Sequence, residues 1–316
     1  MQTRTSFKSM KIAVIGAGNW GKNLARNLNE LGVLAAVAEA SSGLRDGVTS
    51  DYPEVKVVDD YTPLLNEEID AVAIATPVPT HHAIAKEFLL AGKDVFVEKP
   101  MTFTVEEAED LVKIAKENDR VLMVGHLLLY QPAVQWLRDY LAEGSLGKLY
   151  SLHQRRAKLG RARAVENALW SLGVHDVAVL LHLVGEAPRK STFVGHCGLQ
   201  EGVEDDTYLH MEFSDGVIAH LHHSWLWPEN QRGLTVIGEK GMIVYNEVDQ
   251  TLTLHRKTID ADLNNVDDGE ELLFKGDGQP LLLEMQHFID CIKSRKAPRS
   301  CGQNGLDVIR VLSSCS

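Results

Sequence analysis

Lys11-Ile-Ala-Val-Ile-Gly-Ala-Gly-Asn-Trp-Gly21 is the stretch that decides the fold of the first half of this chain. Its apolar run leads directly into glycine, which is typical of a buried parallel strand. Residues 19–31 then carry apolar side chains at helical spacing, and Gly32 follows as a stop signal. The sequence therefore predicts a strand, a glycine turn and a helix. The glycines of the turn are Gly16, Gly18 and Gly21.

The same apolar strand signal recurs down to residue 124. The further predicted strands are 33–38, 55–58, 71–75, 94–97 and 121–124. Helical patterns at 80–91 and 104–118 separate the later ones, and Thr104 with Glu107 forms a capping box. Strands that alternate with helices predict an α/β fold with a parallel, doubly wound sheet. We therefore expect residues 1–124 to form a Rossmann domain that binds NAD(P).

The carboxyl ends of such strands are where ligands bind. After the first strand, glycines permit a tight turn and a close backbone approach to a pyrophosphate. After the second strand comes Glu39, 39 − 21 = 18 residues past Gly21, near the spacing of about 20 expected for an acid that holds a ribose 2′-hydroxyl. This carboxylate would repel the 2′-phosphate of NADP, which favours NAD. Arg45 keeps use of both cofactors open.

Two later strand ends add polar side chains to the same edge of the sheet. Thr76-Pro-Val-Pro-Thr80 follows the fourth strand, and His81 opens the next helix either as a first-turn residue or as a ligand contact. The fifth strand delivers Glu98-Lys99-Pro100. A lysine there can donate to a substrate hydroxyl or stabilise developing alkoxide charge. Pro100 suggests a cis bond that directs this lysine.

Composition and charge limit the class of protein. The chain has 316 residues, 44% hydrophobic and 24% charged, which fits two globular domains. A net charge of −12 argues against a nucleic-acid partner. No apolar run could span a membrane, and residues 1–10 lack the apolar core of a secretory signal. The four cysteines are interpreted as reduced thiols. We expect a cytoplasmic protein, for which Met10 is an alternative start.

The pattern changes in residues 125–316, which we predict to be a substrate-binding and oligomerisation domain. An amphipathic helix is expected at 133–143, a largely apolar helix at 167–184 and a closing helix at 281–294. Residues 258–278 are expected to form an acidic surface loop. Strands are expected at 148–156, 207–213, 217–224, 234–237 and 242–245, which predicts a largely antiparallel sheet with one face available to a partner subunit. The apolar segment 306–312 near the end is interpreted as a shortened or truncated terminus.

Two features of this second half point to a substrate. Residues 155–163 hold five positive charges and no acid, which favours an anion subsite over a merely solvated face. In the helix 167–184, Gly173 suggests close approach by another group, for which the nicotinamide is a candidate. His175 could then be the acid–base group, although a histidine on an apolar helix is more often a core residue.

Three histidines, His220, His222 and His223, could suggest a metal. His220 and His222 share one face of a strand, but no cysteine or clear carboxylate set completes a site. We therefore expect no metal.

Four motifs combine into one pattern that covers nearly the whole chain. They are the glycine motif, Ala75-Thr-Pro77 with His81, Ala91-Gly-Lys-x-Val-Phe-Val-Glu-Lys-Pro100, and Gly173-x-His175. The pattern resembles the Gfo/Idh/MocA oxidoreductases, the family of glucose–fructose oxidoreductase and inositol dehydrogenase. The resemblance implies hydride transfer with a sugar or polyol, an open sheet used in homodimer or homotetramer contacts, and Lys99 and His175 flanking the nicotinamide.

The chain departs from the inositol-type pattern of that family. The usual Asp-x-Gly-x-His-x-x-Asp stands here as Ser171-x-Gly-x-His-x-x-Ala178, so both acids are missing. The segments 159–176 and His222-x-Ser-Trp-Leu226 look more like the nucleotide-sugar branch, which oxidises the 3-hydroxyl of UDP-N-acetylglucosamine or its uronate. The expected substrate is thus a nucleotide sugar, with a free sugar or inositol as the alternative and a non-catalytic NAD(P)-binding regulator as the alternative of another class.

Residue chemistry and resemblance together predict three groups of site residues. The catalytic pair is Lys99 and His175. The cofactor contacts are Gly16, Gly18, Asn19, Trp20, Gly21, Glu39, Thr76, Pro77, His81, Glu98 and Lys99. The substrate contacts are Lys99, His126, Tyr130, Arg161, Arg163, Asn167, Trp170 and His175.

Overall fold

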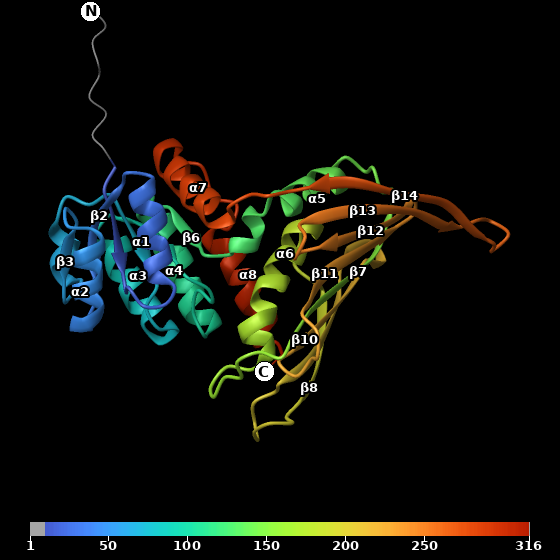
Figure 1. The fold of residues 1–316 in the computed structure, drawn as a ribbon, viewed down its shortest axis with the longest axis horizontal. Helices are drawn as coiled ribbons and strands as arrows, with labels where there is room; N and C mark the ends of the chain where they lie inside the picture. Colours follow the sequence, from blue (N-terminus) through green and yellow to red (C-terminus); the bar gives the residue numbers. More distant parts are fainter. Residues whose placement is uncertain (1–9, 316) are drawn as a thin grey trace, which may run out of the picture. The chain divides into compact units, whose positions relative to one another are not determined.

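The computed structural model describes residues 10–315 and divides them into two compact units (Figure 1). The first unit comprises the chain up to Gly125 together with Leu281–Leu306, and the second comprises His126–Pro280 and the residues from Asp307 onward. The polar segment interpreted above as lacking a secretory signal lies outside the described residues, except for Met10. Within residues 10–315, no helix is long and apolar enough to cross a membrane.

The first unit contains a six-stranded parallel sheet in the order β3-β2-β1-β4-β5-β6. Its strands are β1 (Ile12–Ile15), β2 (Leu34–Ala38), β3 (Lys56–Val58), β4 (Ala71–Ile74), β5 (Asp94–Val97) and β6 (Leu122–Val124). The strands β1, β4, β5 and β6 are buried throughout, as their continuous apolar sequences require. The predicted fold class is confirmed.

Helices connect these strands. They are α1 (Gly21–Glu30), α2 (Ser42–Asp51), α3 (His81–Leu90), α4 (Val105–Glu117) and the short 3-10 turns η1 (Thr62–Asn66) and η2 (Val78–Thr80). The predicted cap of α4 is confirmed, because the Thr104 hydroxyl accepts the Glu107 N–H at 3.2 Å. Helix α7 (Pro280–Ser294) also contributes to this unit, where Phe288 packs against Phe96 of β5 with ring centroids 5.9 Å apart.

The second unit is built on an eight-stranded sheet in the order β14-β13-β12-β11-β7-β10-β9-β8 (Figure 1). Its strands are β7 (Leu149–Ala157), β8 (Lys190–His196), β9 (Asp206–Glu212), β10 (Ile218–Ser224), β11 (Gln231–Gly238), β12 (Gly241–Asn246), β13 (Thr251–Ile259) and β14 (Asn265–Lys275). Only β7 and β10 pair in parallel, and the other neighbours are antiparallel. A largely antiparallel second sheet is therefore confirmed.

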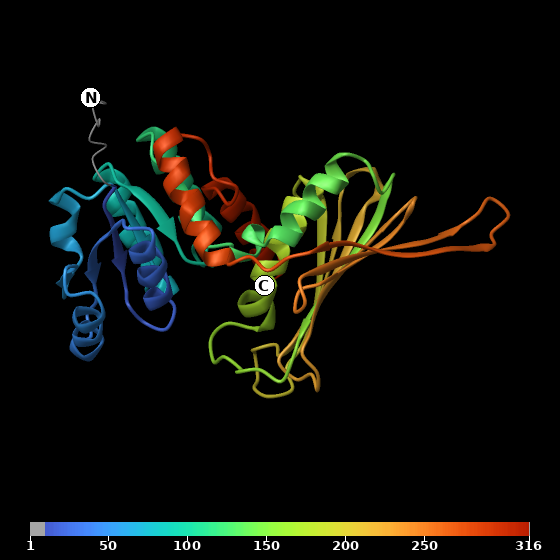
Figure 2. The same cartoon turned by 45° about the horizontal axis from the view of Figure 1, so that its top comes forward.

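One face of this sheet is covered by helices of the same unit, and the other is not (Figure 2). The covering helices are α5 (Pro132–Ala142) and α6 (Val174–Val184), with the short turns η3 (Leu127–Tyr130) and η4 (Leu169–Gly173, five residues of π-helix). Burial alternates along the strands accordingly: Thr207, Leu209 and Met211 of β9 are buried, whereas Tyr208 is half exposed. We call the uncovered side the open face. Helix α8 (Gly302–Ser313) begins in the first unit and ends in the second.

The prediction of a surface loop at 258–278 is wrong. The structure forms a hairpin there from β13 and β14, which extends beyond the rest of the sheet in Figures 1 and 2. Cross-strand ion pairs, such as Lys257 with Asp267 at 3.3 Å, lie along it. The hairpin residues are mostly exposed, so the apolar alternation that would reveal a strand is missing.

Candidate functional site

The glycine turn of the first unit has the geometry that a dinucleotide requires. Gly16 has φ +89°, where a side chain would be strained. A Cβ at Gly21 would lie 1.9 Å from the Gly16 carbonyl oxygen, so only glycine lets α1 start this close to β1. A Cβ at Gly18 would meet no atom within 4 Å, which leaves open space over the loop for a phosphate. Each glycine thus fits its expected role.

A groove of about 520 Å³ runs from this turn along the ends of the strands. It is lined by Ile15, Gly16, Gly18, Ala38, Glu39, Ala40, Leu44, Asp59, Asp60, Tyr61, Ala75, Thr76, Pro77, Thr80 and Ile84. The Glu39 carboxylate accepts the Ala17 N–H at 2.6 Å and the Ser41 N–H at 2.9 Å, which holds it beside the glycine turn. Arg45 donates to the carbonyls of Glu39 and Ala40 at 2.8 and 2.7 Å. These residues fit an adenosine with a free 2′-hydroxyl.

His81 is buried and joins two loops at the same edge. Its Nε2 lies 2.8 Å from the Thr76 carbonyl oxygen, and its Nδ1 lies 3.1 Å from that of Pro100. Burial lowers the pKa of this imidazole, against the opposing effect of the backbone carbonyls. The side chain holds the loop after β4 against the turn after β5, so any effect of His81 on the cofactor would come through Thr76, whose hydroxyl accepts from Thr80 at 2.7 Å.

The end of β5 carries Glu98 and Lys99, both half-buried. The Lys99–Pro100 peptide is cis, as the sequence suggested. The Glu98 carboxylate accepts the Trp20 indole N–H from the start of α1 and the Lys99 backbone N–H at 3.2 Å. Burial raises the pKa of Glu98 to about 7, against the lowering effects of the Lys99 charge and of these two donors. A Cβ at Gly125 would lie 3.0 Å from this carboxyl group, so glycine is needed beside it.

His175 lies in the first turn of α6, directly after the π-helical segment η4. Such π-turns are frequently found at functional sites. The segment is fixed by side chains of the second unit: Asn167 accepts the Trp170 N–H at 2.9 Å and donates to Glu204 at 2.9 Å, and Trp225 donates to the Ser171 hydroxyl at 3.1 Å. Asn167 therefore positions the start of this helix, and its predicted contact with substrate stays a prediction.

Asp176, the residue after His175, anchors the helix to the sheet through an ion cluster that the sequence did not reveal. The fully buried Asp176 carboxylate binds the Arg156 guanidinium at 2.7 Å and the His223 Nε2 at 3.1 Å. Arg156 also binds Glu247, so two acids share one buried cation. Burial would raise the pKa of Asp176, but Arg156 and His223 outweigh it and lower the pKa below its ordinary value.

The same cluster explains why position 173 is a glycine. A Cβ at this position would lie 2.8 Å from the His223 ring and 2.6 Å from the Leu169 side chain. The His223 imidazole of the same unit thus approaches Gly173 closely, and an approach by the nicotinamide stays a prediction.

The basic run at 155–163 starts inside β7 and continues into the loop that follows this strand. Along β7, Arg155 points to the open face, lies over Trp227 at 5.4 Å and donates to Gln231, whereas Arg156 points to the helices and is neutralised. These two residues therefore do not belong to one anion site with the rest. Lys158, Arg161 and Arg163 follow in a loop, where both arginines are exposed and Arg163 pairs with Glu166 at 3.4 Å.

The remaining predicted substrate residues, His126 and Tyr130, are each 2% exposed. All predicted substrate contacts except Lys99 lie in the second unit, whereas Lys99 and the cofactor groove lie in the first. That Lys99 and His175 act as a pair stays a prediction.

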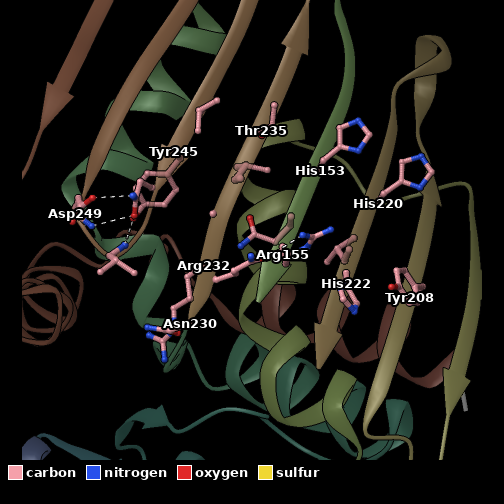
Figure 3. A pocket seen from close by; sticks show the side chains of 18 residues that line it. His153, Arg155, Tyr208, His220, His222, Asn230, Arg232, Thr235, Tyr245 and Asp249 are labelled. Carbon is pink, nitrogen blue, oxygen red and sulfur yellow. Dashed lines mark hydrogen bonds between the residues drawn. The ribbon is translucent and has the colours of Figure 1, made fainter. Parts of the chain in front are cut away.

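A second hollow, of about 730 Å³, lies on the open face of the second sheet (Figure 3). The rings of His153, His220, His222 and Tyr208 lie along it from three neighbouring strands. His153 stacks on His220 with centroids 5.2 Å apart, and Tyr208 stacks on His222 at 4.3 Å. Among residues 10–315, no group of three or more histidines, cysteines or acids could hold a metal ion. None of the predicted catalytic, cofactor or substrate residues lines this hollow.

Comparisons with known proteins agree with the two units. Residues 10–126 match a family described as the oxidoreductase family with an NAD-binding Rossmann fold, and residues 134–244 match the GFO/IDH/MocA C-terminal domain. A crystal structure described as an oxidoreductase, from Magnetospirillum magnetotacticum MS-1, is 32% identical with a TM-score of 0.85, covering 97% of this chain and 99% of that one.

Two curated enzymes are also similar. UDP-N-acetylglucosamine 3-dehydrogenase from Acidithiobacillus ferrooxidans is 27% identical over 78% of this chain and 77% of its own length, and its structure superimposes with a TM-score of 0.86 at 25% identity, covering 97% of this chain and 96% of that one. The NAD-dependent scyllo-inositol 2-dehydrogenase from Bacillus subtilis is 24% identical over 92% of this chain and 88% of its own length. The chain therefore belongs to the Gfo/Idh/MocA oxidoreductase family and is an NAD-dependent dehydrogenase of the type that acts on CH–OH groups.

Proposed function

We propose that this chain transfers hydride between NAD and a hydroxyl of a nucleotide-linked hexose, with the 3-hydroxyl of UDP-N-acetylglucosamine or its uronate as the leading candidate. The observation that carries this proposal is the loop after β7. Its guanidinium groups at Arg161 and Arg163 are exposed in a chain of net charge −12, and arginine suits a diphosphate. Similarity to a UDP-N-acetylglucosamine 3-dehydrogenase supports the same substrate class.

In this proposal Lys99 and His175 carry the proton chemistry. NAD, held at the glycine turn and Glu39, would supply the acceptor for the hydride. His175 takes the hydroxyl proton, and Lys99 stabilises the alkoxide charge and relays the proton. Glu39 and the glycine turn hold the adenosine and diphosphate, whereas Asp176 keeps the first turn of α6 in place through Arg156.

The test is to offer NAD with a panel of nucleotide sugars and to follow absorbance at the reduced-nicotinamide band. We expect turnover with a UDP-linked N-acetylhexosamine or its uronate. Failure with every nucleotide sugar, together with turnover of a free polyol, would favour the inositol-type alternative, which the relative from Bacillus subtilis supports. Ser171 and Ala178, in place of the two acids of that site, argue against this alternative. A regulator without activity is disfavoured because Lys99 and His175 are both present.

Replacing Arg161 by alanine should raise KM for the nucleotide sugar by at least about tenfold, because a hydrogen bond to a charged group contributes about 1.5–3 kcal/mol. KM for a free sugar should not change. The matched control is Arg256→Ala, which removes an exposed arginine paired with Glu271 on the β13–β14 hairpin. Equal KM values for Arg161→Ala, Arg256→Ala and the parent would contradict the role of this loop in binding diphosphate.

We further propose that a second copy of the chain covers the open face. This face exposes Tyr208 and Val194 by 52% and 64%, and the hollow of Figure 3 is lined by Arg155, Arg232 and Asp249. A surface that carries both signs of charge beside apolar groups can pair with itself around a two-fold axis.

Light scattering after gel filtration tests this proposal. Tyr208→Glu should reduce the parent mass to that of a single chain, whereas Leu90→Glu, at an exposed leucine of α3 in the first unit, should leave the mass unchanged. A parent of single-chain mass, or a Tyr208→Glu protein that keeps the parent mass, would contradict the proposal.

A further inference from the structure

Two carboxyl groups come together at the end of β5, and only one of them belongs to a predicted site. Glu98 follows Phe96 by two residues and continues the strand pairing, because its N–H donates to the Ile74 carbonyl at 2.9 Å. Phe96 packs on Phe288 of α7, and Glu284 lies one helical turn before Phe288. Glu98 lies on the same side of the strand as Phe96, and Glu284 lies on the same side of α7 as Phe288. The two carboxyl groups therefore lie next to the contact between Phe96 and Phe288.

The surroundings of the two carboxyl groups differ. Glu98 accepts hydrogen bonds from Trp20 and from the Lys99 N–H, so its ionised form is supported. Glu284 is 0% exposed, and neither of its carboxyl oxygens has a hydrogen-bond partner among residues 10–315. Burial and the Glu98 charge raise the pKa of Glu284 well above its ordinary value. Burial therefore favours the protonated form of Glu284, whereas hydrogen bonds support the ionised form of Glu98.

The groups that face Glu98 limit what can control its charge. The start of α1 contributes the uncharged Trp20 indole, the turn after β6 contributes Gly125 without a side chain, and α7 contributes Glu284, whose pKa is raised by burial. Among residues 10–315, Lys99 is the cation whose charge lowers the pKa of Glu98. A change of charge beside Lys99 would therefore also shift the proton equilibrium of Glu98.

We propose that the Glu98 carboxyl gains and loses a proton as the redox state of the nicotinamide changes, in a site that it shares with the buried Glu284 of α7. This rests on the proposed function, which places Lys99 beside the nicotinamide. The oxidised ring is positive and the reduced ring is neutral. Glu98 is thus ionised in the oxidised complex. When hydride leaves the carbinol carbon, His175 takes the hydroxyl proton and Lys99 relays it, so that Glu98 is the group that finally takes it up as the site loses its positive charge.

Binding of the two cofactor forms without substrate tests the proposal, because their adenosine and phosphate parts are identical. An opposite charge within about 4–6 Å lowers the pKa of an acid by about 1–3 units. The ratio of Kd for NADH to Kd for NAD⁺ should therefore rise by about five- to tenfold between pH 6 and pH 8. Calorimetry in two buffers at pH 7 should show about half a proton more released on binding NAD⁺ than on binding NADH.

Three variants test whether Glu98 causes the pH dependence of the Kd ratio. Glu98→Gln should make the ratio independent of pH, whereas Glu284→Gln, which imitates the neutral acid, should keep its rise. Glu106→Gln, which removes an exposed acid of α4, should behave like the parent. A Glu98→Gln protein that keeps the pH dependence would overturn the proposal. Equal proton release by the parent protein on binding NAD⁺ and NADH would also overturn it, and that measurement does not depend on the folding of any variant.

This test is separate from that of the substrate. A chain that shows the pH-linked difference but oxidises no nucleotide sugar would overturn the proposed substrate and leave the role of Glu98 standing. A chain that oxidises a nucleotide sugar without the pH-linked difference would overturn the role of Glu98 alone.

Discussion

Replacing Lys99 or His175 by alanine should lower kcat for the nucleotide sugar by about 10²–10⁴-fold, the usual contribution of a positioned acid–base group. Lys99 follows a buried strand at the cofactor edge, and His175 stands in the first turn of a helix that an ion cluster anchors. In the proposed mechanism, loss of His175 removes the acceptor of the hydroxyl proton, whereas loss of Lys99 leaves the alkoxide charge without its counterion. Steady-state rates of NAD reduction give both values.

Matched variants distinguish a loss of catalysis from a general loss of folded protein. Lys113→Ala on α4 and His196→Ala on β8 remove an exposed lysine and an exposed histidine, and both should keep kcat near that of the parent. His175→Ala should still bind NAD with the parent Kd, because the glycine turn and Glu39 lie in the other unit. Rates for Lys99→Ala and His175→Ala within about tenfold of the parent would show that neither residue is an acid–base group.

Replacing Asp176 by alanine should lower the free energy of unfolding by about 3–5 kcal/mol, because it leaves part of a buried ion cluster without its charge partner. The carboxylate is 0% exposed and binds both Arg156 and His223. Its pKa is lowered in the folded state, so its stabilisation is present above the ordinary pKa and is lost as the pH falls through the folded value. Urea unfolding at pH 7 therefore measures the full effect.

An exposed ion pair supplies the control. Glu212 pairs with Lys190 at 3.0 Å on the surface, and Glu212→Gln should change the free energy of unfolding by no more than about 1 kcal/mol. If Asp176→Ala unfolded at the same urea concentration as Glu212→Gln, the cluster would not be what anchors α6. Asp176→Ala should also lower kcat, since the helix turn that carries His175 would lose its attachment to β7.

The first unit was largely predictable because its signals are local. The three glycines, the capping Thr104 and the continuous apolar strands each act within a few residues, and they led to the correct sheet. Helix α2 escaped prediction because Val48 is its one buried residue among Ser42–Asp51, which leaves little amphipathic pattern. The acid at Glu284 is detectable from the sequence, since it shares the apolar face of its helix with Phe288.

The second unit was harder to predict because its decisive contacts are distant in sequence. Arg155 and Arg156 look alike in a basic run, and only their alternation on β7 sends one to the open face and the other to Asp176. Glu247 reaches Arg156 across 91 positions of sequence, which no spacing rule anticipates. Polar partners that meet across a sheet depend on strand order and register, and these emerge only from the assembled fold.

In the proposed reaction, hydride passes from a carbon of a nucleotide-linked hexose to NAD. The most direct measurement uses UDP-N-acetylglucosamine, or its uronate, that carries deuterium at carbon 3, with NAD and the full chain, and mass spectrometry of the nicotinamide cofactor. We expect the reduced cofactor to carry one deuterium. Reduced cofactor without deuterium from either labelled sugar would contradict oxidation at the 3-hydroxyl, and no reduction by any nucleotide sugar would contradict the substrate class itself.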